Sequence, residues 1–158
     1  MKKDYFDLMF ELMKENKDIY HIFVGLGWPR VDEFLKEFPD RAFNVEASEQ
    51  TALDIAVGLA YSGKISFVYT ISSFYWRAAE TLRTYLDYEN LHCILIGAGV
   101  KEEYGRHDGF SHSATDIRQL FNIFKNFVQH YPDTKDELIE AIHSGVKNKK
   151  PNFINIHR

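Results

Sequence analysis

Short apolar runs alternate with amphipathic segments along the chain. The runs at 19–26, 65–70 and 92–98 are apolar over almost their whole length, which is typical of strands buried on both faces of a sheet. In 4–16 and 48–61, apolar residues recur every three or four positions, and this spacing predicts helices. Further helices are expected over about 30–38, 73–88, 115–122 and 133–147, and further strands over 42–46, 125–130 and 152–157. The alternation predicts a three-layer α/β/α fold, in which a central, mainly parallel sheet of about six strands lies between two layers of helices.

The polar segment 99–114 interrupts this pattern. It is longer than the two to six residues that usually connect a strand to a helix. It also follows the carboxyl end of the expected strand 92–98, and open parallel sheets bind their ligands at that end of the strands. We therefore expect a functional loop here.

Composition and charge narrow the class of protein. The 158 residues are 45% hydrophobic, with 13 Phe and 9 Tyr, which is enough apolar material for a single domain over 1–158. A net charge of -4 and a pI of about 6.0 argue against a general nucleic-acid binder, which needs a basic surface. No apolar run approaches the roughly 20 residues of a membrane span. Cys93 is the only cysteine, which favours a reducing, cytoplasmic compartment.

Glu49 is the first candidate for chemistry. It lies at the junction between the expected strand 42–46 and the following helix, among small residues. One interpretation is structural: Ser48 caps the helix, and the negative charge of Glu49 is stabilised in the first turn, at the positive end of the helix dipole. The other is functional: the carboxyl group lies at the ligand-binding edge of the sheet. The spacing alone leaves both interpretations open.

The segment 72–78 carries three consecutive aromatic residues, Phe74, Tyr75 and Trp76, followed by Arg77. Neighbours on a helix point about 100° apart, so these rings cannot all face one core. At least one of them is expected to face solvent or a cavity. Arg77 is either a surface charge or part of a site.

The loop segment 106–112 is the third candidate. Its His107, Asp108 and His112 are possible metal ligands, but Gly109 makes a regular helix through them unfavourable, and no second cluster has ligand spacing. We therefore predict no metal site in this chain.

Three motifs in order resemble the pyrimidine-binding domain of the transketolase and 1-deoxyxylulose-5-phosphate synthase family of thiamine diphosphate enzymes. They are the segment 45–50 with the helix residues 56–60, the strand 67–70 followed by Phe74 and Arg77, and the loop segment 108–112. The resemblance runs from about Phe43 to Pro132. It implies the three-layer fold that the hydrophobic pattern predicts.

The resemblance implies a role for each matching residue. Glu49 is expected to act in catalysis by hydrogen-bonding the pyrimidine nitrogen of the cofactor, since an apolar pocket raises the proton affinity of a carboxylate. His112 is expected to assist proton transfers. The expected cofactor-binding residues are Glu49, Phe74, Ala47 and Leu26, and the expected substrate-binding residues are Asp108, His112 and Arg77.

The sequence departs from the family pattern in several places. Glu46 stands where the family has a glycine, and Ile71 stands where it has an aromatic residue. No arginine near 132–133 matches those that bind a sugar phosphate, and in the loop only Lys101 and Arg106 offer a replacement. The resemblance therefore leaves open whether the acceptor is phosphorylated.

The chain also lacks the glycine-aspartate-glycine motif and the asparagine pair that hold the diphosphate through Mg²⁺ in this family. We therefore expect one subunit of a split transketolase-like enzyme, which transfers a ketol unit from a ketose donor to an aldehyde or sugar acceptor. Its partner subunit is expected to bind the diphosphate and Mg²⁺, with two of each subunit. The alternatives are a subunit of a two-component 2-oxoacid decarboxylase and a non-catalytic scaffold of the same fold.

Overall fold

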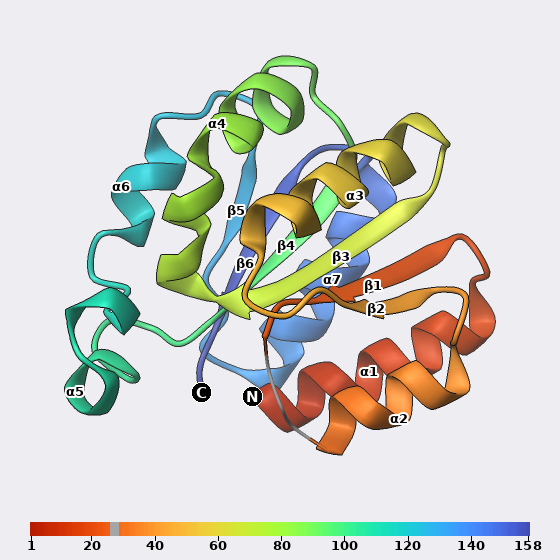
Figure 1. Cartoon of the computed structure of the whole chain (residues 1–158), viewed down its shortest axis with the longest axis horizontal. Coiled ribbons are helices and arrows are strands. Elements are labelled where there is room, and N and C mark those ends of the chain that lie inside the picture. The colour runs from red at the N-terminus through yellow and green to blue at the C-terminus, as the bar shows by residue number, and fades with distance from the viewer. Residues whose placement is uncertain (26–28) are drawn as a thin grey trace.

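The computed structural model describes residues 1–25 and 29–158. Its centre is a six-stranded sheet with the strand order β2-β1-β3-β4-β6-β5, in which every pair of neighbours is parallel (Figure 1). The strands are β1 (Ile19–Phe23), β2 (Ala42–Asn44), β3 (Ile65–Ile71), β4 (Cys93–Ala98), β5 (Val128–His130) and β6 (Asn152–Ile156). Helices cover both faces, so the predicted three-layer α/β fold is confirmed.

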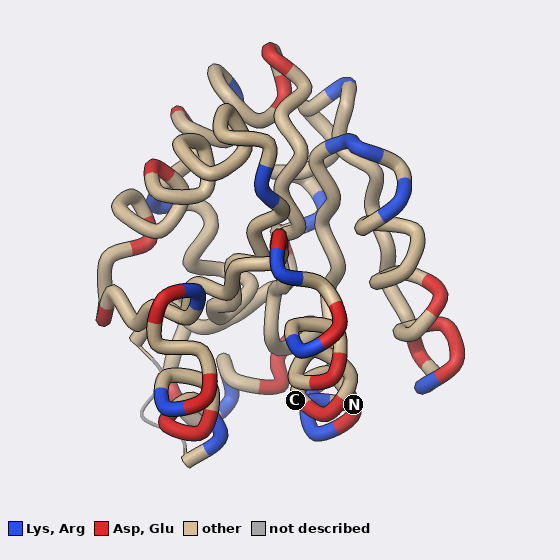
Figure 2. The backbone as a smooth tube through the Cα atoms, turned by 90° about the vertical axis from the view of Figure 1, so that its right-hand side faces the viewer, with Lys and Arg blue, Asp and Glu red and all other residues tan. Residues whose placement is uncertain are grey.

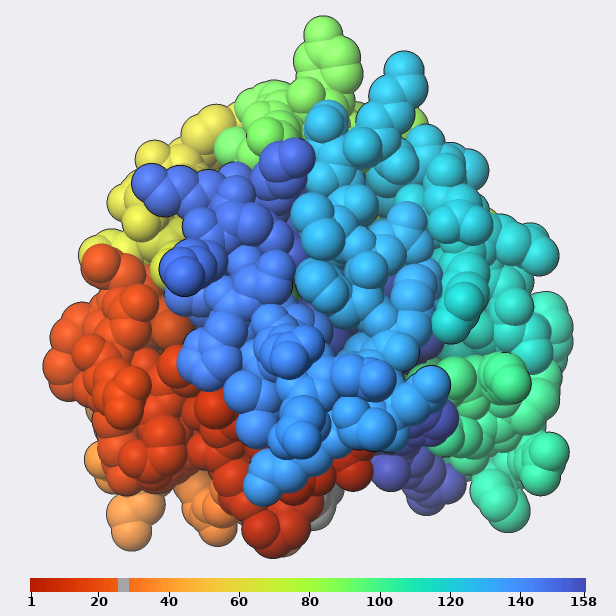
Figure 3. Space-filling view, turned by 180° about the vertical axis from the view of Figure 1, so that it is seen from behind, coloured from red at the N-terminus to blue at the C-terminus, as the bar shows by residue number. Residues whose placement is uncertain are grey.

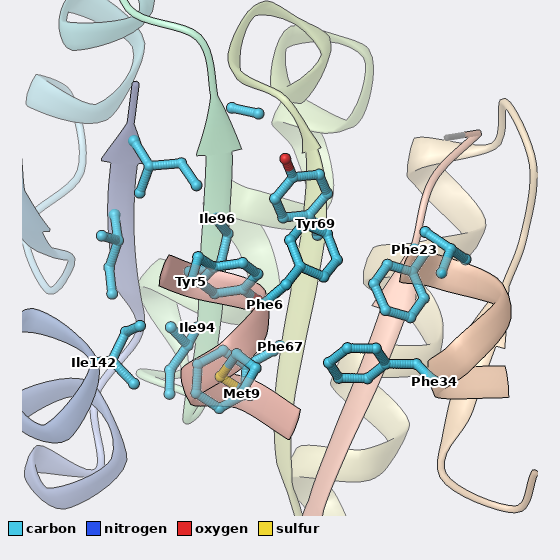
Figure 4. Packing of buried hydrophobic residues seen from close by; sticks show 14 of the residues in the cluster. Tyr5, Phe6, Met9, Phe23, Phe34, Phe67, Tyr69, Ile94, Ile96 and Ile142 are labelled. Carbon is cyan, nitrogen blue, oxygen red and sulfur yellow. The ribbon is translucent and has the colours of Figure 1, made fainter. Parts of the chain in front are cut away.

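One face of the sheet, which we call the closed face, carries α1 (Lys2–Glu15), α2 (Pro29–Glu37) and α7 (Lys135–Asn148). Alternate strand residues such as Phe67, Tyr69, Ile94 and Ile96 point to this side and pack against these helices (Figure 4). From behind, α7 lies across the middle of the molecule beside the N-terminal segment (Figure 3). Because the apolar positions of each helix recur at helical spacing, one continuous apolar layer forms.

The opposite face, which we call the site face, carries the elements α3 (Glu49–Tyr61), η1 (Ser72–Ala78), α4 (Ala79–Thr81), η2 (Leu82–Tyr88) and α6 (Ile117–Asn122). The intervening strand residues, among them Val68, Leu95 and Phe153, point to this side and pack against these helices. The sheet is therefore buried on both faces, as its apolar strands predicted.

The largest difference from the sequence prediction lies in 73–88. A single α-helix was expected, but η1 is a 3₁₀-helix and η2 is a π-helix, with the three-residue α4 between them. The buried residues explain the tight first part, since Tyr75 and Ala78 are three positions apart. The Tyr75 hydroxyl also donates to the Val68 carbonyl at 2.8 Å, which ties η1 to β3.

The loop 99–114 is also more ordered than expected. It contains α5 (Gly105–Asp108) and a 3₁₀ turn η3 (Phe110–His112). Gly109 separates them with a φ of 87°, a conformation that favours glycine, so the prediction that this residue interrupts a regular helix is confirmed.

The strand order creates a switch point in the sheet. From β1 the chain turns to β2 on one side, and then returns to β3 on the other side. The connections after β1 and β3 therefore run in opposite directions from the carboxyl ends of these two strands. Ligands of open parallel sheets bind in the crevice at such a point.

A buried polar junction shapes the same edge between β3, β4 and β6. The Asn155 side chain donates to Ser72 Oγ at 2.8 Å and to the carbonyls of Gly97 and Gly99 at 2.9 Å. A Cβ atom on Gly97 would lie 2.7 Å from Ser72 Oγ, so only glycine leaves room for this contact. The junction holds the start of η1 at the end of β4.

The charged residues do not separate onto opposite sides of the molecule. Positions of both signs occur on several helices, while in α7 the acidic ones lie near its start and a basic one near its end (Figure 2). Within 1–25 and 29–158, no helix has the length and apolar character needed to cross a membrane.

Candidate functional site

The residues predicted from the motifs come from three neighbouring connections at the carboxyl edge of the sheet. Ala47 and Glu49 follow β2, Phe74 and Arg77 follow β3, and the segment with Asp108 and His112 follows β4. Contacts between α3 and η1 and between η1 and η3 bring these connections together. The predicted residue Leu26, which follows β1, lies outside the described residues.

Glu49 is a buried carboxylate at the start of α3. Its exposed fraction is 5%. Ser48 occupies the N-cap position, but its hydroxyl donates to Thr51 Oγ1 at 2.7 Å and forms no cap with the helix backbone. Of the two interpretations, the structural one holds for the positions of Ser48 and Glu49 but not for a side-chain cap, and the burial of Glu49 does not fit a solvated first turn.

Arg77 is the partner of this carboxylate. Its Nη1 donates to Glu49 Oε1 at 2.8 Å, and half of the Arg77 side chain is exposed. Its guanidinium carbon also lies 4.0 Å from the centroid of the Phe74 ring. Because side chains three positions apart eclipse in a 3₁₀-helix, the winding of η1 places Arg77 over Phe74.

Phe74 connects this pair to the loop after β4. The ring centroids of Phe74 and His112 are 4.9 Å apart, in an edge-to-face arrangement. The Ser73 hydroxyl donates to the Ser111 carbonyl at 2.8 Å and fixes η1 to this loop. A cavity of about 290 Å³ beside them is lined by Ser73, Phe74, Trp76, Arg77, Phe110, Ser111, Ser113 and Asp116. The structure thus brings Glu49, Arg77, Phe74 and His112 into one connected group.

The base of the loop is anchored under the sheet edge. Gly99 has a φ of 90°, and a Cβ atom there would clash with the Tyr104 ring, which packs against it. The Ala114 amide donates to the Lys101 carbonyl at 2.7 Å and closes the loop on itself. These contacts hold the segment between them in place.

Two further predicted site residues are exposed to solvent. Asp108 is exposed at the end of α5, and its carboxylate forms no hydrogen bond or ion pair with any residue in the described part of the chain. Ala47 is exposed before α3. Neither placement tests the roles that were predicted for these residues.

A larger cavity lies on the other side of the loop. Its volume is about 730 Å³, and its lining includes the four basic residues Lys101, Arg106, Arg118 and Arg158. Glu103 and Asp133 also line it, and both bind His157, at 2.6 and 3.2 Å. The hydrogen bond to Glu103 raises the pKa of His157. The cavity therefore carries charges of both signs.

Sequence reasoning missed the pairing of Arg77 with Glu49. The spacing of three between Phe74 and Arg77 signals only their own contact on a 3₁₀-helix, and not the pairing with Glu49. Sequence reasoning also missed the reason why the family has glycine at position 46, where Glu46 adopts a φ of 52°. Among residues 1–25 and 29–158, no group of three or more His, Cys, Asp and Glu side chains is arranged to hold a metal ion.

Comparisons with known proteins identify the family of the chain. The family model of the transketolase pyrimidine binding domain matches residues 11–158. A putative transketolase C-terminal section from Methanocaldococcus jannaschii is 29% identical over 160 residues, which cover 100% of this chain and 50% of that protein. An apulose-4-phosphate transketolase subunit from Actinobacillus succinogenes is 30% identical over 80% of this chain and 41% of that protein.

A solved structure described as a split gene transketolase, an inactive beta4 tetramer, shares the fold. It matches with a TM-score of 0.84 and 24% identity, over 99% of this chain and 51% of that chain. The chain therefore spans about half the length, or less, of these relatives. From the parallel sheet, the order of the site connections and the family match, we conclude that this chain belongs to the transketolase pyrimidine-binding domain family.

Proposed function

We propose that this chain is the pyrimidine-binding subunit of a split transketolase-like enzyme, with 1–158 as its single domain. The enzyme transfers a ketol unit from a ketose donor to an aldehyde or sugar acceptor. The observation that carries the proposal is the buried carboxylate of Glu49, which Arg77 links to the Phe74 ring at the carboxyl edge of the sheet.

These residues fit the aminopyrimidine end of thiamine diphosphate. Glu49 supplies a hydrogen-bond acceptor with little access to water, and Phe74 supplies an aromatic face. Ala47 precedes α3, and with Leu26 it completes the proposed lining of the cofactor site. When bound, the cofactor supplies the nucleophile that cleaves a carbon–carbon bond of the donor. Glu49 would accept the hydrogen bond of a ring nitrogen and so share its proton.

The loop residues are proposed to handle the donor. His112 Nδ1 lies 3.0 Å from Ser111 Oγ, and this hydrogen bond leaves Nε2 to exchange a proton with a donor hydroxyl. Asp108 accepts hydrogen bonds from donor hydroxyls, because its exposed carboxylate has no partner in the described part of the chain. Arg77 lines the cavity of about 290 Å³ together with Phe110 and Ser111 of this loop, and it contributes a cation.

The proposed partner subunit binds the diphosphate and Mg²⁺. The relatives support this division, since one is named as a subunit of a transketolase and another as a C-terminal section. The site face also exposes Trp76, Tyr85 and Tyr88, by 44%, 40% and 83%. Exposed aromatic residues on one side of a molecule are typical of a protein interface. Two copies of each subunit are proposed, in a cytoplasmic complex.

The test is the rate of the reconstituted complex with Glu49→Gln, which keeps the shape of the side chain and removes its charge. We expect a loss of about 10²–10⁴-fold in rate, with the complex intact by size-exclusion chromatography. The matched control is Glu140→Gln, on the exposed side of α7. An unchanged rate would contradict the proposal and favour the scaffold. Turnover of 2-oxoacids with release of CO₂, but not of ketoses, would favour the decarboxylase.

A further inference from the structure

Arg77 contacts both groups that are proposed to bind the aminopyrimidine. Its Nη1 lies 2.8 Å from Glu49 Oε1, and its guanidinium carbon lies 4.0 Å from the centroid of the Phe74 ring. Within the described part of the chain, no other residue forms a hydrogen bond with the Glu49 carboxylate. The Arg77 side chain therefore binds both the carboxylate and the aromatic ring that are proposed to bind the aminopyrimidine.

A guanidinium group and an aminopyrimidine have the same binding chemistry. Both are flat and delocalised, both donate N–H groups from the edge, and both stack on aromatic rings. Glu49 is only 5% exposed, so its carboxylate offers little room for a second planar donor while Arg77 is in place. The two groups therefore compete for Glu49.

Arg77 is also able to move away from Glu49 and Phe74. Half of its side chain is exposed, and it lies at the mouth of the cavity of about 290 Å³ beside η1. Water solvates the half-exposed guanidinium once it leaves, the incoming ligand takes over the hydrogen bond to Glu49, and a single cation–ring contact at an exposed site adds little. A competitor held this weakly lowers the apparent affinity for the ligand by about three- to thirtyfold, and does not block binding.

We propose that Arg77 is an internal ligand of the aminopyrimidine site, which binds Glu49 and Phe74 until the cofactor displaces it. This inference rests on the proposed function of the chain. In the free chain the Arg77 guanidinium pairs with the Glu49 carboxylate, because an unpaired buried charge is costly. After displacement, the same guanidinium lies at the cavity edge and faces the donor.

The first experiment measures the binding of thiamine, which carries the aminopyrimidine without the diphosphate, to the full chain by NMR titration. We expect Arg77→Ala to bind thiamine about tenfold more tightly than the unmodified chain. Arg77→Lys is expected to fall between them, because an ammonium group keeps the charge and loses the flat shape. Arg83→Ala is the matched control, since Arg83 pairs with the exposed Glu80 on the same segment, and no change is expected.

A second readout needs no ligand. The ¹⁵Nη resonances of Arg77 report the ion pair directly, since Nη1 is the atom that donates to Glu49. They should shift in Glu49→Gln, and they should shift in the unmodified chain when thiamine is added.

Equal or weaker thiamine binding by Arg77→Ala would overturn the inference and would show that Arg77 holds the ligand. Arg77 ¹⁵Nη resonances that are unchanged in Glu49→Gln would overturn it as well. Either result leaves the proposed function standing if Glu49→Gln still weakens thiamine binding. Absence of thiamine binding in every variant would contradict both the inference and the proposed function.

Discussion

The closed face and the site face cover the same sheet in different ways. The closed face uses the regular helices α1, α2 and α7, of 14, 9 and 14 residues. The site face follows α3 with the 3₁₀-helix η1 and the π-helix η2, each of 7 residues. Runs of 3₁₀-helix of this length are uncommon, and π turns are frequent at functional sites.

The aromatic residues show what the difference means. On the closed face Tyr5, Phe6 and Phe34 are completely buried and pack against one another. On the site face Tyr88 and Trp76 are exposed. Regular helices turn their aromatic residues into one core, whereas the irregular winding turns some of them outward and aligns Phe74 with Arg77. Both faces bury an apolar cluster, but only the site face carries the residues for which we propose a role in catalysis.

The largest expected effect tests this difference through stability. Phe6→Ala on the closed face should lower the free energy of unfolding by about 3–5 kcal/mol, because it leaves a cavity among several rings. Tyr88→Ala on the site face should change it by less than about 0.5 kcal/mol, since the side chain is 83% exposed. Urea unfolding measures both values. Similar losses for the two variants would remove the distinction between the faces.

The next effect tests the site face through activity. In the reconstituted enzyme, His112→Ala should lower kcat/KM for the ketose donor by about 10²-fold, because a proton-transfer group is lost. Cofactor affinity and unfolding free energy should stay nearly unchanged. His143→Ala, an exposed position on α7, is the control. If His112→Ala instead abolishes cofactor binding, the loop has been assigned to the wrong ligand.

A buried histidine on the closed face should make the free energy of unfolding depend on pH. Complete burial lowers the pKa of His21 to about 3 from 6.5, and the Tyr5 hydroxyl lies 2.6 Å from its Nε2. Between these two pKa values the unfolded chain binds a proton that the folded chain does not. Stability is therefore lost as the pH falls below about 6.5, and the loss reaches about 2 kcal/mol at pH 5.

Denaturant unfolding at pH 5 and pH 7.5 measures this dependence. In His21→Gln the contribution of this group to the slope should disappear, even if the variant is less stable at both values of pH. A slope equal to that of the unmodified chain would show that His21 is not the group responsible.

The smallest expected effect concerns the strained turn before α3. Glu46 has a φ of 52°, which glycine adopts more easily than other residues. Glu46→Gly should raise the free energy of unfolding by about 0.5–1 kcal/mol, after the greater entropy of the unfolded chain is taken into account. Glu46→Ala keeps the strain and removes the charge, so it should bring no such gain. Equal stability of the two variants would show that this turn stores no strain.

Much of the secondary structure was predictable from local patterns. The helices 4–16 and 48–61 and the strands 65–70 and 92–98 agree with α1, α3, β3 and β4 to within two residues. Hydrophobic periodicity predicts such elements well because one face of each is buried. The same pattern failed at 73–88, where the winding changes twice along a single amphipathic stretch.

The site was predictable in part. The motifs identified Glu49, Phe74 and His112, which do come together, because the ends of parallel strands meet at one edge of a sheet. They did not show that Asp108 is exposed at the end of α5, since the position of a loop side chain depends on how the loop is anchored. Here that anchor is the packing of Tyr104 against Gly99.

The sequence by itself determined the alternation of strands and helices, the order of the three motifs and the family, because these are carried by local periodicity and by residue identity. Only the tertiary structure decided that Arg77 lies on both Glu49 and Phe74. That contact requires α3 to pack against η1, and it requires η1 to wind with three residues per turn while Tyr75 binds the Val68 carbonyl. The packing of α3 against η1 joins residues far apart in the chain, so no local pattern contains the contact of Arg77 with Glu49, whereas the spacing of three favours its contact with Phe74.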